Sequence, residues 1–428
     1  MSTKPDPTPA RGGSAGTTTG AARLRVGAAR TDITPQDLTG LHPMGRPFER
    51  VHDPIHLRAL VADDGTTEVA LISLDLVEAG DMTPVRRRIE AELGIPFDHI
   101  VITATHTHSA PRIGDVSPGA LAHAGSQQSL AYTATVYDAM LETLRTARAS
   151  ARPATVGTAT GSADVNINRE VYSDGEWILG FNPEGPCDKA VRVVRFDGLD
   201  GRPIALVVNY SVHPTVVLGT GEVSADLAGA ACRHVEDHFD EQAVCLWTPG
   251  TIGDQAPRVD LGLPFGAAPD ARQAERAYRA MEAQGLMVGA EAVRVAEGIT
   301  RGSSTAPISA GQRTVHLPCK AGVDVMASMR QQRTETVPLR LALIRIGDIA
   351  LAGVSGEVVT EIGERLREAS PLADTLLVSI ANDRIGYIAD DARFDRPVHS
   401  VRGCPIVRGH AEDTIVGGIL ALLEESTR

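Results

Sequence analysis

Residues 100–109 read IVITATHTHS, an apolar, β-branched run that passes directly into two histidines. The run predicts a buried strand over Ile100–Ala104, and α/β folds commonly place their chemistry where a strand ends in a loop. In an extended segment the side-chain period is two, so we expect His106 and His108 to point to the same side. Such a pair suits a metal site, or one ligand beside an acid–base group; two exposed loop histidines are the alternative.

On both sides of this strand the chain alternates between strand and helix patterns. Apolar runs predict strands at Val69–Leu76, Ile100–Ala104, Val191–Phe196, Ile204–Tyr210, Val244–Trp247, Leu339–Ile346, Ala350–Val354 and Leu376–Ile380. Helical spacing is found at Pro84–Leu93, Leu130–Arg148, Ala225–His238, Ala271–Glu297, Val358–Glu368 and Glu412–Glu424. We therefore predict an α/β fold, with α+β as the alternative, in which mixed sheets are flanked by helices.

Composition restricts the class of protein. The chain has 428 residues and a formal net charge of −13, which argues against binding along nucleic acid. Its five cysteines are scattered and form no CxxC motif, so we expect no thiolate zinc site and a reducing, cytoplasmic location. Residues 1–23 lack an apolar stretch and predict a disordered tail. Residues 24–428 are predicted to form one domain without stable membrane association, and a homo-oligomer is compatible with this interpretation.

Four further positions could carry chemistry. His213 leaves the predicted strand Ile204–Tyr210 as His106 leaves its own strand, although a lone histidine there is more often structural. Glu357 opens the predicted helix that runs to Glu368, where an acid ordinarily complements the helix dipole, and it could also bind a metal. Arg169 could bind a carboxylate or a developing oxyanion, or lie on the surface. Tyr387 follows a glycine after a predicted strand and by default fills a core.

Read together and in order, these segments resemble the neutral (non-lysosomal) ceramidase family. The matching motifs are VGAARTDITP at 26–35, HTHS at 106–109, NINR at 166–169, the strand-end His213, GD at 253–254, GE at 356–357 and NDRIGY at 382–387. Individually each motif is short, but their order extends the resemblance across residues 26–425.

The resemblance implies a zinc-dependent amide hydrolase with a ceramidase-like catalytic domain. It implies that Zn²⁺ is bound by His106, His213, Glu357 and Tyr387. It further implies that His108 transfers protons and that Arg169 stabilises the oxyanion, which agrees with the chemistry these side chains can perform.

The sequence also departs from the family's pattern, chiefly in ways that concern the substrate. We expect no C-terminal β-sandwich, and no export signal is found. Where the family has a second site tyrosine, this chain has His399, which we predict as its substitute. Aromatic residues make up only 4% of the chain, while arginines fall in the site loops. They are Arg112, Arg258, Arg384 and Arg402. We therefore predict a small polar or anionic N-acyl amide, rather than ceramide, as the small-molecule substrate.

Three other interpretations remain open from the sequence. A zinc-dependent esterase or lactonase would use the same residues. A metal-dependent barrel would place its HxH motif after the first strand. Here the motif follows at least two predicted strands. A catalytically inactive binding protein would not need the full residue set that this chain retains.

Overall fold

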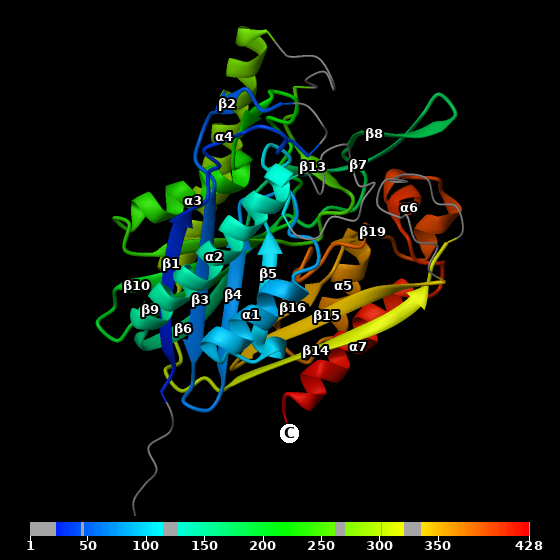
Figure 1. The fold of residues 1–428 in the computed structure, drawn as a ribbon. Coiled ribbons are helices and arrows are strands. Elements are labelled where there is room, and N and C mark those ends of the chain that lie inside the picture. The colour runs from blue at the N-terminus through cyan, green and yellow to red at the C-terminus, as the bar shows by residue number, and fades with distance from the viewer. Residues whose placement is uncertain are drawn as a thin grey trace, which may run out of the picture.

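The computed structural model describes residues 23–43, 47–113, 127–261, 270–300, 302–320 and 335–427. The predicted disordered tail at residues 1–23 lies outside them, except for Arg23. Within this part of the chain, mixed sheets are flanked by seven α-helices, so the predicted fold class is confirmed. Figure 1 shows the arrangement.

The larger sheet has eight strands in the order β12-β10-β9-β6-β1-β3-β4-β5. Their bounds are β1 Arg25–Asp32, β3 His56–Asp63, β4 Glu68–Leu74, β5 Ile100–Ala104, β6 Arg152–Ser162, β9 Ala190–Gly198, β10 Pro203–Tyr210 and β12 Val244–Pro249. The neighbours β4 and β5 at one edge are parallel, and so are β10 and β12 at the other edge. A helix connects each of these pairs, α1 (Thr83–Leu93) in the first and α3 (Asp226–His238) in the second. Both edges are therefore βαβ units.

The smaller sheet has four strands in the order β14-β15-β16-β18. They are β14 Ile308–Pro318, β15 Thr336–Ile346, β16 Ile349–Val354 and β18 Asp374–Val378. Strands β16 and β18 are parallel and are joined through α5 (Thr360–Ala369), which makes a third βαβ unit. These three units matter because each one carries a predicted site residue just beyond the end of its first or second strand.

Helices cover the outer faces of both sheets, and the inner faces pack together. The inner core joins apolar side chains from β3, β4, β10, β15 and β16. Helices α1 and α2 (Gln127–Ala149) pack on β1, β3, β4 and β5, while α3 and α4 (Ala271–Gly298) pack on β9, β10 and β12. Helices α5 and α7 (Ala411–Glu425) cover the smaller sheet. The result is a helix–sheet–sheet–helix order, which Figure 1 shows with α1 and α2 nearest the viewer.

The segment at the end of β18 ties the two edges of the larger sheet together. Ser379 donates its backbone N–H to the carbonyl of Pro249 in β12 (2.9 Å), and its own carbonyl accepts from Thr103 Oγ1 in β5 (3.0 Å). Asn209 of β10 donates its side-chain amide to the carbonyl of Leu377 (2.9 Å). These contacts bring the chain segments that follow β5, β10 and β16 into one region, although they are far apart in the sequence.

Shorter elements surround this region. A three-stranded sheet has the order β13-β7-β8, from β7 Asn166–Ser173, β8 Glu176–Asn182 and β13 Gln255–Pro257. Two parallel pairs are formed by β2 (Arg50–Val51) with β11 (Glu222–Val223), and by β17 (Glu357–Val358) with β19 (Tyr387–Ile388). Helix α6 is His399–Gly403, and Phe97–His99 and Ala392–Asp395 are 3₁₀ turns. The β7–β8 hairpin projects from the body of the fold in Figure 1.

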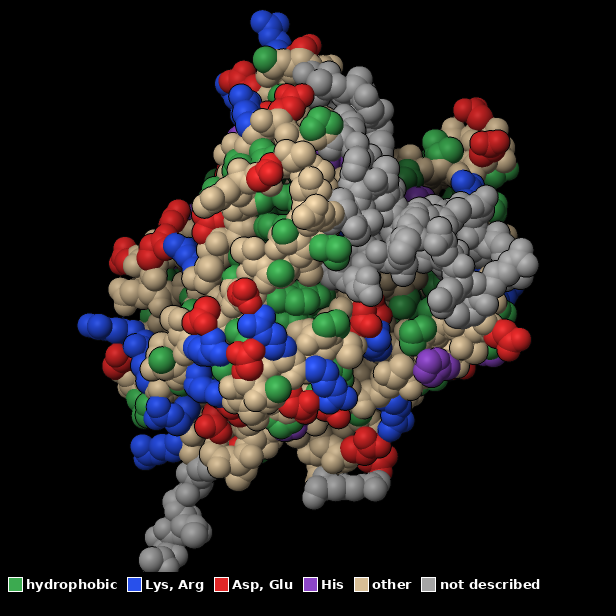
Figure 2. Space-filling model, viewed as in Figure 1, with side chains coloured by type: hydrophobic (Ala, Val, Ile, Leu, Met, Phe, Trp, Pro, Cys, Tyr) green, Lys and Arg blue, Asp and Glu red, His purple; other side chains and the backbone are tan. Residues whose placement is uncertain are grey.

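Charged side chains of both signs are interspersed over helices α1 and α2, on the face shown in Figure 2. Arg88 bonds Glu92 and Asp138 (both 2.6 Å), which links the two helices, and Arg145 reaches Glu92 from α2 (2.7 Å). All of these side chains are at least one-third exposed, so solvent screens each pair and its contribution to stability is small. This surface is the polar outer side of an amphipathic helix pair.

Asp226, the first residue of α3, gives a testable pH dependence. It is fully buried, and its carboxylate accepts N–H groups from Val217 (3.1 Å) and Leu227 (2.6 Å). Burial nevertheless raises the pKa of Asp226 to about 7, against about 3.9 for an unfolded aspartate. The folded protein thus holds this proton more tightly. The resulting contribution to stability is complete below about pH 4 and is lost as the pH rises toward 7.

Loss of the Asp226 proton should lower the free energy of unfolding of the parent protein between pH 5 and pH 8. We expect Asp226→Asn to make this fall smaller by roughly 2–3 kcal/mol. Asparagine also adopts the left-handed backbone, here with a φ of 52°. It loses one backbone hydrogen bond at every pH, so the pH dependence, not the absolute stability, is the readout. Urea unfolding at both pH values measures it. Parallel curves for the variant and the parent would contradict the assignment.

Candidate metal centre

Three predicted site residues follow strands that belong to the three βαβ units. His106 comes two residues after β5, His213 three residues after β10, and Glu357 three residues after β16. The expectation that the segment at His106 is extended is wrong, because His106 has a φ of 71°. The chain turns at this residue. His106 and His108 nevertheless approach each other, with their Nε2 atoms 3.1 Å apart.

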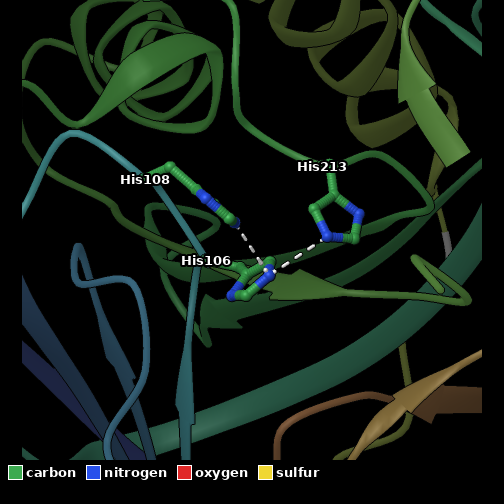
Figure 3. Close-up of side chains that lie close together, drawn as sticks. All are labelled: His106, His108 and His213. Atoms are coloured by element: carbon green, nitrogen blue, oxygen red, sulfur yellow. Dashed lines mark hydrogen bonds between the residues drawn. The ribbon is translucent and has the colours of Figure 1, made fainter. Parts of the chain in front are cut away.

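The three imidazoles form a compact cluster (Figure 3). His106 Nε2 lies 3.1 Å from His108 Nε2 and 3.2 Å from His213 Nε2, and one nitrogen from each ring lies within 4.8 Å of the other two. His106 and His213 are almost completely buried, whereas His108 is partly exposed. Converging ring nitrogens of this kind are the donor set that zinc and similar divalent metals prefer.

Backbone carbonyls fix the orientation of two of these rings. His106 Nδ1 lies 2.5 Å from the carbonyl of Val77, and His213 Nδ1 lies 2.7 Å from that of Ile252. A carbonyl can only accept, so Nδ1 carries the proton in each ring and the lone pair of Nε2 faces the cluster. Burial lowers the pKa of His213 to about 3, which keeps the ring neutral. Two lone pairs facing each other at 3.2 Å fit a cation between them.

Glu357 lies on the same side as His213. Its Oε2 is 3.1 Å from His213 Nε2 and 3.5 Å from His106 Nε2. Burial acts to raise the pKa of Glu357, but the charge of Arg384 holds it well below its usual range. The sequence-based prediction that Glu357 opens a helix is wrong. It lies in the two-residue strand β17, and α5 begins at Thr360.

Tyr387 is the direct partner of Glu357 in the β17–β19 ladder. Its ring is nearly parallel to that of His213, with centroids 6.4 Å apart. Burial and the charge of Glu357 raise the pKa of Tyr387 to about 12. Gly403 is needed beside this ring, because a Cβ there would lie 2.3 Å from Tyr387 Cδ2. The fold thus places the phenol next to the histidine and the carboxylate.

Arg169 reaches the cluster from β7. Its Nη2 donates to the carbonyl of Gly253 (2.9 Å) and to Tyr387 Oη (3.1 Å). Gly253 must be glycine, because a Cβ would come within 2.6 Å of the carbonyl oxygen of Glu357. Asp254 is fully buried and accepts from the backbone N–H and the hydroxyl of Thr360, at 3.1 and 2.9 Å. The Gly253–Asp254 turn therefore fixes Arg169 and the start of α5 together.

Comparison with known proteins agrees with this geometry. A family model described as neutral/alkaline non-lysosomal ceramidase, N-terminal, matches residues 24–260, which is more than half of the chain. The chain belongs to this ceramidase family. Membership confirms the resemblance predicted from the motifs and indicates a hydrolase of amide bonds.

Individual ceramidases show how far the similarity extends. The neutral ceramidase of Mycobacterium tuberculosis is 25% identical over 87% of this chain and 72% of its own length. That of Drosophila melanogaster is 26% identical over 56% of this chain, but only 36% of the relative is covered. The crystal structure of the neutral ceramidase from Pseudomonas aeruginosa has the same fold, with a TM-score of 0.78 at 17% identity, covering 94% of this chain and 75% of that one.

His399, predicted to replace the ceramidase family's second site tyrosine, lies beside Tyr387. It begins α6, and its ring centroid is 5.0 Å from that of Tyr387, in an edge-on arrangement. Burial and the nearby charge of Arg169 lower the pKa of His399 to about 4. His399 is thus a neutral, partly exposed group beside the histidine cluster, on the Tyr387 side.

Glu78 is a site residue that the sequence analysis did not find. It is buried, and its two oxygens contact Arg384 Nη1 (2.6 Å) and Arg112 Nη1 (3.1 Å). Arg384 also donates its Nε to Glu357 Oε1 (2.7 Å). The signal was an acid four residues after the apolar strand β4, and the other site residues likewise follow their strands by two or three residues. Two of the four predicted arginines are thus paired with carboxylates behind the histidines.

The other two arginines lie farther out. Arg258 is half-exposed and contacts Asp164 (3.3 Å), and Arg402 is exposed and donates to the carbonyl of Trp177 (3.1 Å). Within the described residues, no helix is both long enough and apolar enough to cross a bilayer.

Proposed function

We propose that the chain is a zinc-dependent hydrolase of a small amide. The observation that carries the proposal is the convergence of His106, His213 and Glu357, from three separate βαβ units, with Tyr387 paired to Glu357. These four side chains would hold the ion. When bound, zinc would act as a Lewis acid and lower the pKa of a bound water to about 7.

The protein's own groups would manage the charge and the proton. Addition of water to the amide carbonyl places negative charge on its oxygen, and Arg169 presents a nearly buried cation toward Tyr387 on that side of the cluster. The C–N bond then breaks, and the leaving nitrogen must gain a proton. Partly exposed His108 can take up the proton that the attacking water loses and pass it to this nitrogen, because burial and the two neighbouring histidines lower its pKa well below the usual value and leave the ring neutral beforehand.

We further propose that the substrate carries an anionic group close to the scissile amide. Arg112 has only one-tenth of its side chain exposed, and among the described residues its Nε and Nη1 make no hydrogen bond of good geometry. Glu78 and Glu357 balance Arg112 and Arg384 in charge, so a divalent ion would make the region positive. A carboxylate or phosphate group on the substrate would accept hydrogen bonds from the guanidinium donors and would neutralise this positive charge.

Arg112→Gln tests this substrate class. We expect kcat/KM for a short anionic N-acyl amide to fall by about 10–100-fold, the effect of losing one charged hydrogen-bond pair, while a neutral amide of the same length changes little. Steady-state kinetics on the two substrates gives the comparison. Arg258→Gln is the matched control, because Arg258 is half-exposed and paired elsewhere. Equal losses on both substrates, or a clear preference for long-chain ceramide in the parent, would contradict the proposal.

The reaction class is tested with matched amide and ester substrates. Preferred turnover of the amide supports the proposal, and turnover of the ester alone would favour an esterase or lactonase. Protein purified without chelators that holds no metal and hydrolyses neither substrate would favour an inactive binding protein. We also propose a cytoplasmic location, supported by the five cysteines, which are scattered along the sequence and form no CxxC motif.

A further inference from the structure

A second cavity lies apart from the histidine cluster. It occupies about 420 Å³ between β2 and β11 on one side and the first turns of α4 on the other, and Figure 1 shows β2 close to α4. None of the predicted metal ligands lines it. Its volume is within the range of small-molecule sites. The side chains that decide its chemistry are Arg50, His52, Glu222, Ala274, Glu275 and Tyr278.

Glu222 provides an unmet acceptor in this cavity. It is 6% exposed, and its Oε1 accepts from Arg50 Nη2 at 2.8 Å. Its Oε2 is buried and has no hydrogen-bond partner among the described residues. An unsatisfied buried carboxylate oxygen is unfavourable, so a ligand that donates a hydrogen bond here would be favoured. Three carboxylates line the cavity, those of Glu49, Glu222 and Glu275, against the single cation of Arg50.

An aromatic pair forms one wall. The rings of His52 and Tyr278 stack with centroids 3.5 Å apart and planes within 2° of parallel. His52 Nδ1 is held 2.8 Å from Asp53 Oδ2, and Tyr278 donates its hydroxyl to Thr220 Oγ1 (3.1 Å), so both rings are fixed. Stacked rings beside carboxylates favour a positively charged ligand that carries an apolar part.

We infer that this cavity binds an organic ammonium ion. Its N–H group would donate to Glu222 Oε2, and its apolar part would lie against Tyr278 and Ala274. Arg50 does not make the cavity a site for anions, because its side chain is 70% exposed and already bonded to Glu222. The three carboxylates would also repel an anionic ligand.

The site is connected to His108 through a short path. Strand β11 ends at Val223, and the next residue, Ser224, donates its N–H to the carbonyl of Ser109 (2.8 Å). Thr107 Oγ1 donates to the carbonyl of Ser224 (2.8 Å). Both neighbours of His108 are therefore bonded to the segment that follows Glu222. The ammonium ion would have one of two sources. It would be the amine that amide hydrolysis releases, or a separate ligand that acts on the segment carrying His108.

Calorimetry with phenethylammonium, and with the neutral 2-phenylethanol as its match, tests the inference. We expect the parent protein to bind the ammonium at least tenfold more tightly than the alcohol. Glu222→Gln should remove most of that difference. Ala274→Trp, a change on a partly exposed helix position, should fill the cavity and weaken binding tenfold without entering the core. Glu282→Gln, an exposed acid of α4 paired with Arg233, is the control and should bind as the parent does.

Kinetics distinguishes the two sources of the ligand. Competitive inhibition by phenethylammonium against an amide substrate would identify the cavity as the place of the product amine. A change in kcat without competition would identify a separate ligand. Either result supports an ammonium site. Equal affinity for the ammonium and the alcohol, unchanged binding in both cavity variants, or no binding to the parent would overturn it, whatever the reaction at the metal centre.

Discussion

Replacing His213 by alanine should remove bound metal and amide hydrolysis together, with a fall in kcat/KM of at least about 10³-fold. His213 Nε2 lies between His106 Nε2 (3.2 Å) and Glu357 Oε2 (3.1 Å), and the ring is 1% exposed. Its loss would therefore leave an incomplete ligand set, because among the described residues only His106 and His108 contribute the other ring nitrogens of the cluster. Metal content by mass spectrometry and steady-state kinetics on the same sample measure both effects.

His316→Ala is the control for this experiment. His316 is an exposed histidine of β14, on the smaller sheet and outside the cluster, so its removal should change neither metal content nor rate. A His213→Ala protein that keeps a full equivalent of metal and the parent's rate would contradict the assignment of His213 as a ligand.

Replacing His108 by alanine should separate the two effects. We expect the variant to keep its metal and to lose at least about 10²-fold in kcat, the usual contribution of a general acid–base group. His108 differs from His106 and His213 because it is partly exposed. It can therefore face the substrate while the other two rings face inward.

Metal content is the decisive readout for His108, because its Nε2 is within 3.1 Å of His106 Nε2 and could itself bind the ion. If His108→Ala loses metal as His213→Ala does, the ligand set is the three histidines, and the proton-transfer role fails. A variant that keeps its metal but also keeps the parent's kcat would equally refute that role. The pH profile of kcat adds a check, since removal of a proton carrier should change its shape.

Part of the fold could be predicted because eight of its strands contain continuous apolar runs. Strands such as β5 and β16 are buried on both faces, so their sequences contain few polar residues. The prediction missed β1, β3, β6, β7, β8 and β14. Of these, β6 and β8 are mostly exposed or half-exposed: β6 mixes threonine and glycine with few apolar residues, and the apolar side chains of β8 face outward. These strands owe their conformation to pairing with β9 and β7, and the local sequence does not specify those partners.

The site could be predicted in part for a similar reason. His106 and His213 follow strong strands, and strand ends are positions that the sequence marks well. Glu357 and Tyr387 were assigned through the resemblance, and their local structure was misjudged, because the β17–β19 ladder joins residues thirty positions apart and is only two residues long. Glu78 was missed because an acid after a strand has no distinctive pattern until its partners Arg112 and Arg384 are known.

The central claim is that four side chains from distant parts of the chain hold one divalent ion. A crystal structure of protein purified without chelators, with diffraction recorded on both sides of the zinc absorption edge, tests it most directly. We predict one anomalous peak bound by His106, His213, Glu357 and Tyr387. Crystals of hydrolytically active protein without a peak at this position, or with the metal bound by other residues, would contradict the account.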